Sequence, residues 1–146
     1  MKSVSPYLNF PGTTEEAFAF YRSVFGGDYL GVVRFRDLDP EGTPEADLDK
    51  IAHIALPLAQ DSVLMGTDAL ESQGQALTAG NSSYIMLEAE SAGEAARLFD
   101  ALAAGGRTHM PLQQTGWAER YGVCADRFGV QWMVNYTGGA GRAQGA

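Results

Sequence analysis

Two stretches of the chain decide its fold: TTEEAFAFYRSVFGG at residues 13–27 and SAGEAARLFDALAAGG at residues 91–106. Adding 78 to a residue number takes Thr13 to Ser91 and Glu16 to Glu94. Each stretch begins with a hydroxyl side chain followed three residues later by Glu, the capping box that opens a helix. Each ends in glycines, which can close a helix in the left-handed conformation. The two matches in register indicate an internal duplication, with a period longer than that of solenoid repeats.

Strands are predicted around both helices in the same order. Apolar runs typical of strands lie at residues 4–10, 29–35, 51–58 and 62–66 in the first half, and at 83–89, 108–112, 120–125 and 130–136 in the second. Residues 37–49 are rich in Pro, Gly and Asp, which predicts a loop. Each half thus reads strand–helix–strand–strand–strand. We expect module one at residues 1–69, a connector at 70–80, module two at 81–136 and a flexible tail at 137–146.

Composition excludes several classes of partner. The chain of 146 residues suits one domain or two small modules with a common core. Its net charge of −8 repels nucleic acid and anionic membranes. Cys124 is the only cysteine, which excludes an internal disulfide and fits a reducing compartment. No secretory leader opens the chain and no apolar run approaches the ~20 residues needed to span a bilayer. We therefore expect a cytoplasmic protein with no nucleic-acid or membrane partner.

Both predicted helices carry apolar side chains at helical spacing, so we expect each helix to cover one face of its sheet. Strand alternation then places Ile54 and Leu56 on the covered face and turns His53 to the opposite one. The residues expected opposite the helices are His53, Ala55, Tyr84, Met86, Glu88, Gln131, Met133 and Asn135. Two four-stranded sheets with helices on their convex sides would enclose a concave surface lined by these residues.

Five segments of the sequence resemble one family. They are PYLNF at residues 6–10, AFAFY at 17–21, MPL at 110–112, GWAERYG at 116–122 and DRFGVQW at 126–132. Together they resemble the PhnB-like branch of the vicinal-oxygen-chelate superfamily, which includes glyoxalase I, extradiol dioxygenases and bleomycin-binding resistance proteins. The resemblance implies an α+β fold of two βαβββ modules, with cupped mixed sheets and helices on the convex side. It also implies a homodimer.

Enzymes of that superfamily hold a divalent metal with one side chain from the first strand and one from the last strand of each module. By the local motifs, the four positions fall on Pro6, Met65, Tyr84 and Met133. Proline offers no ligand, a thioether is a poor ligand for a hard cation and a neutral tyrosine is a weak one. The neighbouring residues Tyr7, Leu64, Ile85 and Trp132 are no better suited. We therefore expect no superfamily metal centre and no cofactor.

His53 is the titratable side chain best placed for chemistry. It could act as a general base or as a polar anchor, because its reference pKa lies near neutrality. The alternative is a histidine whose ring is hydrogen-bonded to a backbone carbonyl or a neighbouring strand. Asp68 and Glu88 could join it in a relocated metal site.

A second cluster consists of Trp117, Glu119, Arg120 and Tyr121. An aromatic pair beside an ion pair could stack on a planar ligand and bind its polar edge. The alternative is a core tryptophan next to a solvated ion pair. Met65, Met86 and Met133 would add the soft, adaptable lining found at promiscuous binding surfaces, although methionines also serve as ordinary core residues.

Three functions remain open. The first is a metal-free binding protein that holds a small, partly apolar or aromatic molecule in the cup between the modules. Its ligand-binding residues would be His53, Met65, Tyr84, Met86, Trp117, Tyr121 and Met133. The second is a superfamily enzyme, of the lyase, isomerase or dioxygenase type, that uses His53 or a relocated metal. The third is a dimeric protein whose cup is filled by its own side chains. Of these, the missing metal ligands favour binding.

Overall fold

A computed structural model describes residues 1–140 of the chain. The described residues form two compact units that divide between Thr78 and Ala79, inside the expected connector at residues 70–80. Of the tail expected at residues 137–146, residues 141–146 lie outside the described part. Thr137 is attached to the second unit, because its backbone N–H donates to the carboxylate of Glu88 over 2.9 Å.

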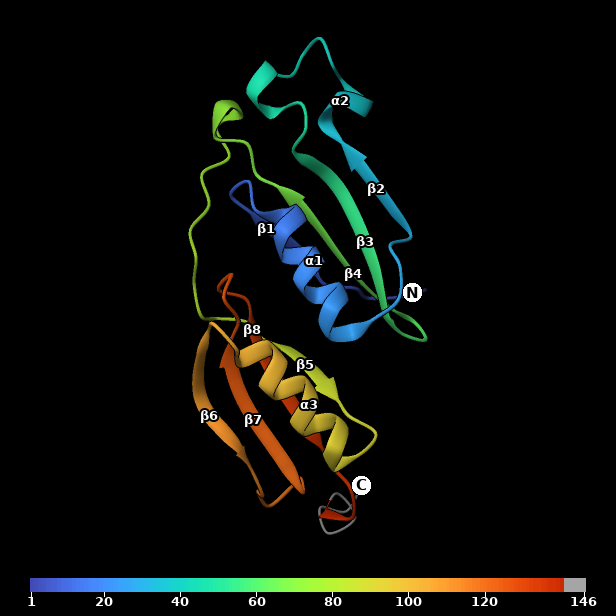
Figure 1. Ribbon diagram of the computed structural model, residues 1–146, viewed down its shortest axis with the longest axis vertical. Helices are drawn as coiled ribbons and strands as arrows, with labels where there is room; N and C mark the ends of the chain where they lie inside the picture. Colours follow the sequence, from blue (N-terminus) through green and yellow to red (C-terminus); the bar gives the residue numbers. More distant parts are fainter. Residues whose placement is uncertain (141–146) are drawn as a thin grey trace. The chain divides into compact units, whose positions relative to one another are not determined.

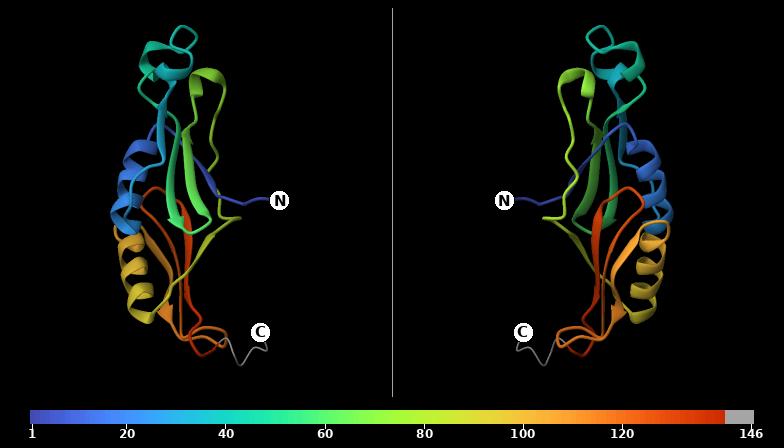
Figure 2. Two further views of the ribbon diagram at one scale, coloured as in Figure 1. Left: turned by 90° about the vertical axis from the view of Figure 1, so that its right-hand side faces the viewer. Right: turned by 90° about the vertical axis from the view of Figure 1, so that its left-hand side faces the viewer.

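The first unit is a four-stranded sheet with one long helix on one face (Figures 1 and 2). Its sheet has the strand order β1-β4-β3-β2, in which β1 runs parallel to β4 and the other pairs are antiparallel. In chain order its elements are β1 (Tyr7–Phe10), α1 (Thr14–Phe25), β2 (Gly31–Arg34), α2 (Phe35–Leu38), η1 (Glu45–Asp47), β3 (Ile51–Ala59), β4 (Ser62–Asp68) and η2 (Glu71–Gln73).

The second unit repeats this arrangement. Its sheet has the order β5-β8-β7-β6, and β5 runs parallel to β8. In chain order its elements are β5 (Ile85–Glu88), α3 (Ala92–Ala103), β6 (Arg107–Gln113), β7 (Arg120–Ala125) and β8 (Gln131–Tyr136). The predicted α+β fold of two βαβββ modules with mixed sheets is therefore confirmed.

Each helix packs its apolar face on its own sheet. In the first unit α1 packs on β3 and β4. Phe18 is fully buried, and its ring lies over Gly66 of β4 so closely that a Cβ there would come within 2.6 Å of the ring. In the second unit α3 packs on β6, β7 and β8, and Phe99 lies in the same way over Gly122 of β7. The glycines thus provide the space for the aromatic rings that attach the helices.

The two helix starts differ, although their sequences match. Ser91 is confirmed as an N-cap, because its Oγ accepts a hydrogen bond from the backbone N–H of Glu94 over 3.0 Å. The same prediction for Thr13 is wrong: its side chain makes no capping bond. Instead, the buried carboxylate of Asp68 accepts hydrogen bonds from the backbone N–H of Thr14 at 3.0 Å and its Oγ1 at 2.6 Å. A tertiary acceptor from β4 has replaced the local cap.

Some predicted boundaries are also wrong. The strand expected at residues 4–10 begins only at Tyr7. The strand expected at 29–35 ends at Arg34, because the Asp37 carboxylate accepts from the Arg34 backbone N–H and begins the short helix α2 there. The loop expected at 37–49 contains the end of α2 and the helix η1. Within the described residues, no helix is long and apolar enough to cross a membrane.

Candidate functional site

We call the face of the first sheet opposite α1 the first open face. Its strand residues include Tyr7 of β1, Met65 of β4 and Ala55 of β3, which lie level with one another across the sheet. His53 lies two residues before Ala55 on β3 and therefore shares this face. The predicted placement of His53 opposite the helix is confirmed by the burial of Ile54 and Leu56 on the other face.

Tyr7 and His53 are joined on the first open face. The phenolic oxygen of Tyr7 lies 2.9 Å from Nδ1 of His53, and the ring centroids are 5.7 Å apart. Partial burial raises the pKa of the Tyr7 phenol, which keeps it protonated and able to donate. If the phenol donates to Nδ1, the neutral imidazole carries its proton on Nε2 and presents a donor there. If Nδ1 donates to the phenol, Nε2 is left as a base.

We call the face of the second sheet opposite α3 the second open face. One row of it is apolar and crosses all four strands, with each residue level with the next. The row consists of Met86 of β5, Met133 of β8, Val123 of β7 and Met110 of β6. Met86 is 58% exposed and Met110 is 37% exposed, so the row has an accessible surface at both of its ends.

An aromatic pair lies beside this apolar row. Tyr121 is two residues before Val123 on β7, and Trp117 in the loop before β7 packs edge-to-face against it at 5.2 Å between centroids. Trp117 is 50% exposed, which excludes the alternative of a core tryptophan. Arg120 was expected to form an ion pair with the Glu119 side chain. Its Nη1 instead donates to the backbone carbonyl of Glu119 over 2.7 Å.

A polar network on the second open face was missed by sequence reasoning. Asn135 of β8 lies level with Glu88 of β5, and its amide Nδ2 donates to the Glu88 carboxylate over 2.7 Å. The Oδ1 atom of Asn135 is buried and, within residues 1–140, accepts no hydrogen bond. Only the parallel register of β5 with β8 brings the two side chains together, and no local sequence signal predicts that register.

The sequence-predicted ligand residues fall into two groups, one in each unit. His53 and Met65 share the first open face. The others belong to the second unit: Tyr84, Met86, Trp117, Tyr121 and Met133. That the two groups form one site stays a prediction.

The metal positions carried over from the superfamily stay a prediction, but strand register shows which residues are level with them. Tyr7, and not Pro6, lies level with Met65, and Met86, and not Tyr84, lies level with Met133. The offset between these level residues of the first strands is therefore 79, one more than the 78 that relates the starts of α1 and α3. The residues that are level, a phenol and three thioethers, likewise do not fit a hard divalent cation.

A relocated metal site receives no support from the acidic residues proposed for it. The Asp68 carboxylate faces α1, away from His53, and also accepts from the backbone N–H of Ile51 over 2.8 Å. The Glu88 carboxylate is occupied by Asn135 and Thr137. In the described part of the chain, no group of three or more His, Cys, Asp or Glu side chains is arranged to hold a metal ion.

Comparisons with known proteins identify relatives along most of the chain. Residues 6–134 match the family model described as the Glyoxalase/Bleomycin resistance protein/Dioxygenase superfamily. The protein YjdN of Escherichia coli K12 is 34% identical over 90% of this chain and 93% of its own length. Protein PA1353 of Pseudomonas aeruginosa is 38% identical, with a TM-score of 0.81 over 92% of this chain and 96% of its own. A Bacillus cereus structure described as a putative 3-demethylubiquinone-9 3-methyltransferase, PhnB protein, is 26% identical, with a TM-score of 0.68 over 91% and 98% of the two chains.

Proposed function

Because the chain belongs to the glyoxalase/bleomycin resistance protein/dioxygenase superfamily, we propose that it is a metal-free protein that binds a small, partly apolar or aromatic molecule. The observation that carries this proposal is the second open face, where Met86 is 58% exposed on the side opposite α3 and Trp117, in the loop before β7, is 50% exposed beside Tyr121. Flexible thioethers beside an aromatic edge suit ligands of varied shape.

The chemistry of the donor side chains supports binding without a metal. Tyr7 and Met65, which are level on the first sheet, and Met86 and Met133, which are level on the second, offer a phenol and thioethers, and these are poor ligands for Mg²⁺, Ca²⁺ or Zn²⁺. The carboxylates of Asp68 and Glu88 already accept hydrogen bonds from protein donors. A ligand held on the second open face would therefore be contacted by apolar and aromatic side chains and not by a metal ion.

A thermal-shift screen against bicyclic aromatic compounds, with and without divalent cations, tests the proposal. A compound at a hundred times its dissociation constant should stabilise the protein by about 2.7 kcal/mol. Trp117→Ala and Met86→Ala should weaken binding, whereas Leu38→Ala, at a residue 67% exposed on α2, serves as the control for loss of a surface apolar group. If no compound raises the melting temperature, a face filled by its own side chains is the better description. Elemental analysis that finds about one metal ion per chain would contradict the metal-free assignment.

The second candidate is an enzyme that uses His53, and the Tyr7–His53 hydrogen bond favours it. A positioned imidazole with one nitrogen bonded to a phenol can present a defined donor or base at the other nitrogen. Its signature would be turnover of a bound compound that His53→Ala abolishes while binding persists. Binding without any turnover favours the first proposal.

The expected homodimer and cytoplasmic location belong to the same proposal. Sedimentation equilibrium at several protein concentrations tests the dimer: a mass of twice 15.6 kDa supports it and a single chain at all concentrations contradicts it.

A further inference from the structure

A polar hollow lies in the second unit at one end of its open face. It has a volume of about 770 Å³ and is lined by strand residues and by the turns after α3 and β7. Its lining includes Arg107 and His109 of β6, Ala125 of β7, Gln131 of β8 and Tyr84, which immediately precedes β5. Of the polar residues in this lining, only Tyr84 was among the predicted ligand-binding residues. The others lie outside the apolar row.

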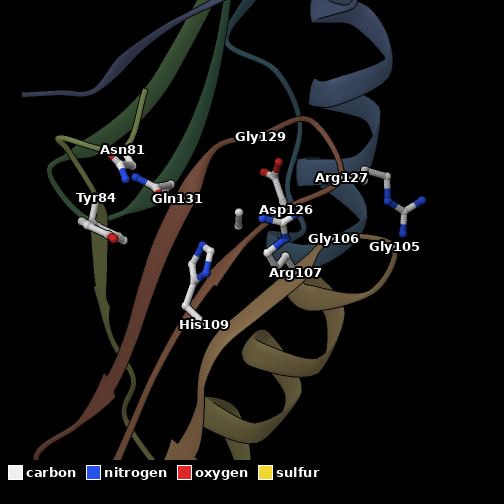
Figure 3. Close-up of a pocket in the computed structure, with 11 residues that line it drawn as sticks. Asn81, Tyr84, Gly105, Gly106, Arg107, His109, Asp126, Arg127, Gly129 and Gln131 are labelled. Carbon is white, nitrogen blue, oxygen red and sulfur yellow. The ribbon is translucent and has the colours of Figure 1, made fainter. Parts of the chain in front are cut away.

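Strand register explains why the sheet is hollow at this point. Gln131, Ala125 and Arg107 lie level with one another on β8, β7 and β6. Tyr84 precedes β5 by one residue and is therefore level with Gln131. Within this row Ala125 is the small residue, so the longer side chains on either side of it form walls over a low floor. Figure 3 labels Tyr84, Gln131 and Arg107 of this row.

A bulge in β6 adds His109 to the hollow. The register between β6 and β7 shifts between Thr108 and Met110, which leaves His109 as the extra residue. Bulges of this kind redirect a side chain out of the regular alternation. The imidazole of His109 projects into the hollow, with Tyr84 on one side and Arg107 on the other (Figure 3).

The accessible charge in this hollow is positive. The guanidinium of Arg107 forms no hydrogen bond or ion pair with any residue in the described range 1–140. The lining carboxylate, Asp126, is 3% exposed, and accepts from the backbone N–H groups of Phe128 and Val130 and from Nε1 of Trp132. Arg127 at the rim is directed to the backbone carbonyl of Ala104. An arginine without a partner in the described residues attracts anions locally, in spite of the protein's net charge of −8.

We propose that this hollow binds an oxyanion, a carboxylate or a phosphate group, with Arg107 as its charged partner and His109 and the Tyr84 phenol as further donors. This inference rests on the proposed function, because Tyr84 is two residues from Met86 and the body of the same ligand would lie over the apolar row. The ligand class is then a small organic anion with an apolar or aromatic body. An arginine fork forms two charge-assisted hydrogen bonds to such a group.

Calorimetric titration with three naphthalene probes tests the inference. 1-Naphthoate and 1-naphthyl phosphate carry the two oxyanions, and neutral 1-naphthol presents the same ring. The protein should bind at least one anion about 10- to 100-fold more tightly than the naphthol, as expected for a hydrogen bond to a charged group. Arg107→Met should remove this preference and leave naphthol affinity within about twofold. Lys2→Met, which removes one positive charge from an exposed residue before β1, should change neither affinity.

The outcomes separate the inference from the proposed function. Equal affinity of the unmodified protein for the three probes overturns the oxyanion site and leaves aromatic binding intact. An anion preference that survives in Arg107→Met also overturns it. If no naphthalene probe binds, a titration with inorganic phosphate tests the oxyanion site by itself. Shifts of the His109 ring signals in NMR spectra that are absent in Arg107→Met support the site. Unshifted signals overturn it. Circular dichroism of each variant verifies that it is folded.

Discussion

The phenolic oxygen of Tyr7 lies 2.9 Å from Nδ1 of His53, although β4 separates the two strands that carry them. The bond therefore forms only when β1, β4 and β3 are all assembled in the first sheet, and not when a single pair of strands is formed. It also turns an isolated histidine into a defined polar group on the first open face.

Removal of the Tyr7 hydroxyl should alter the NMR signals of the His53 ring but should have only a small effect on the stability of the protein. Tyr7→Phe should lower the free energy of unfolding by at most about 1 kcal/mol, since Tyr7 is 46% exposed and water can replace the lost bond. The ring ¹⁵N shifts of His53 should move, while those of His109 serve as an internal reference. Tyr29→Phe is the matched control. Unchanged His53 shifts in Tyr7→Phe would show that the bond does not form in solution.

The two helix starts should respond differently to the same substitution. Ser91→Ala removes an acceptor for the Glu94 N–H and should cost about 1 kcal/mol of unfolding free energy. Thr13→Ala removes a side chain that makes no capping bond, so its effect should be a few tenths of a kcal/mol. Urea denaturation of the two variants measures the difference. Equal losses would contradict the replacement of the Thr13 cap by Asp68.

The glycines beneath the helix aromatics should not tolerate a methyl group. A Cβ at Gly66 would come within 2.6 Å of the Phe18 ring, and one at Gly122 within 2.7 Å of the Phe99 ring. Gly66→Ala and Gly122→Ala should each destabilise the protein by about 1–3 kcal/mol through overpacking. Gly31→Ala in β2 is the control, because nothing lies within 4 Å of its Cβ position. Thermal melts of the three variants provide the comparison, and a wild-type melting temperature for Gly66→Ala would refute the close packing.

Cys124 should be unreactive in the folded protein. Burial, with a smaller contribution from the charge of Asp126, raises the pKa of its thiol to about 11 from 9.0. Because the unfolded thiol ionises first, its contribution to stability is present below pH 9 and is lost as the pH rises toward 11. Alkylation by iodoacetamide at pH 8 should therefore be slow in buffer and fast in urea, as followed by mass spectrometry. Equally fast alkylation in both would show that the thiol is accessible.

Local pattern was enough to predict the two modules. Helical spacing of apolar residues, glycines at the helix ends and alternation along the strands depend on neighbours within about ten residues, so they can be read without tertiary information. The face of His53 and of Met133 followed from alternation alone. The N-cap predicted at Ser91 was also confirmed, because its acceptor and the donor, the Glu94 N–H, are only three residues apart.

By itself, the sequence determined the α+β class, the duplication and the unsuitability of the superfamily metal positions, because these depend on residue type and short-range periodicity. Only the tertiary structure decided that Asp68 caps α1, that Tyr7 pairs with His53 and that Asn135 pairs with Glu88. It alone placed Arg107 and His109 around Ala125. The reason is that these contacts join strands distant in sequence, and their register, including the bulge at His109, is set by the packing of the whole sheet and not by the residues of any one strand.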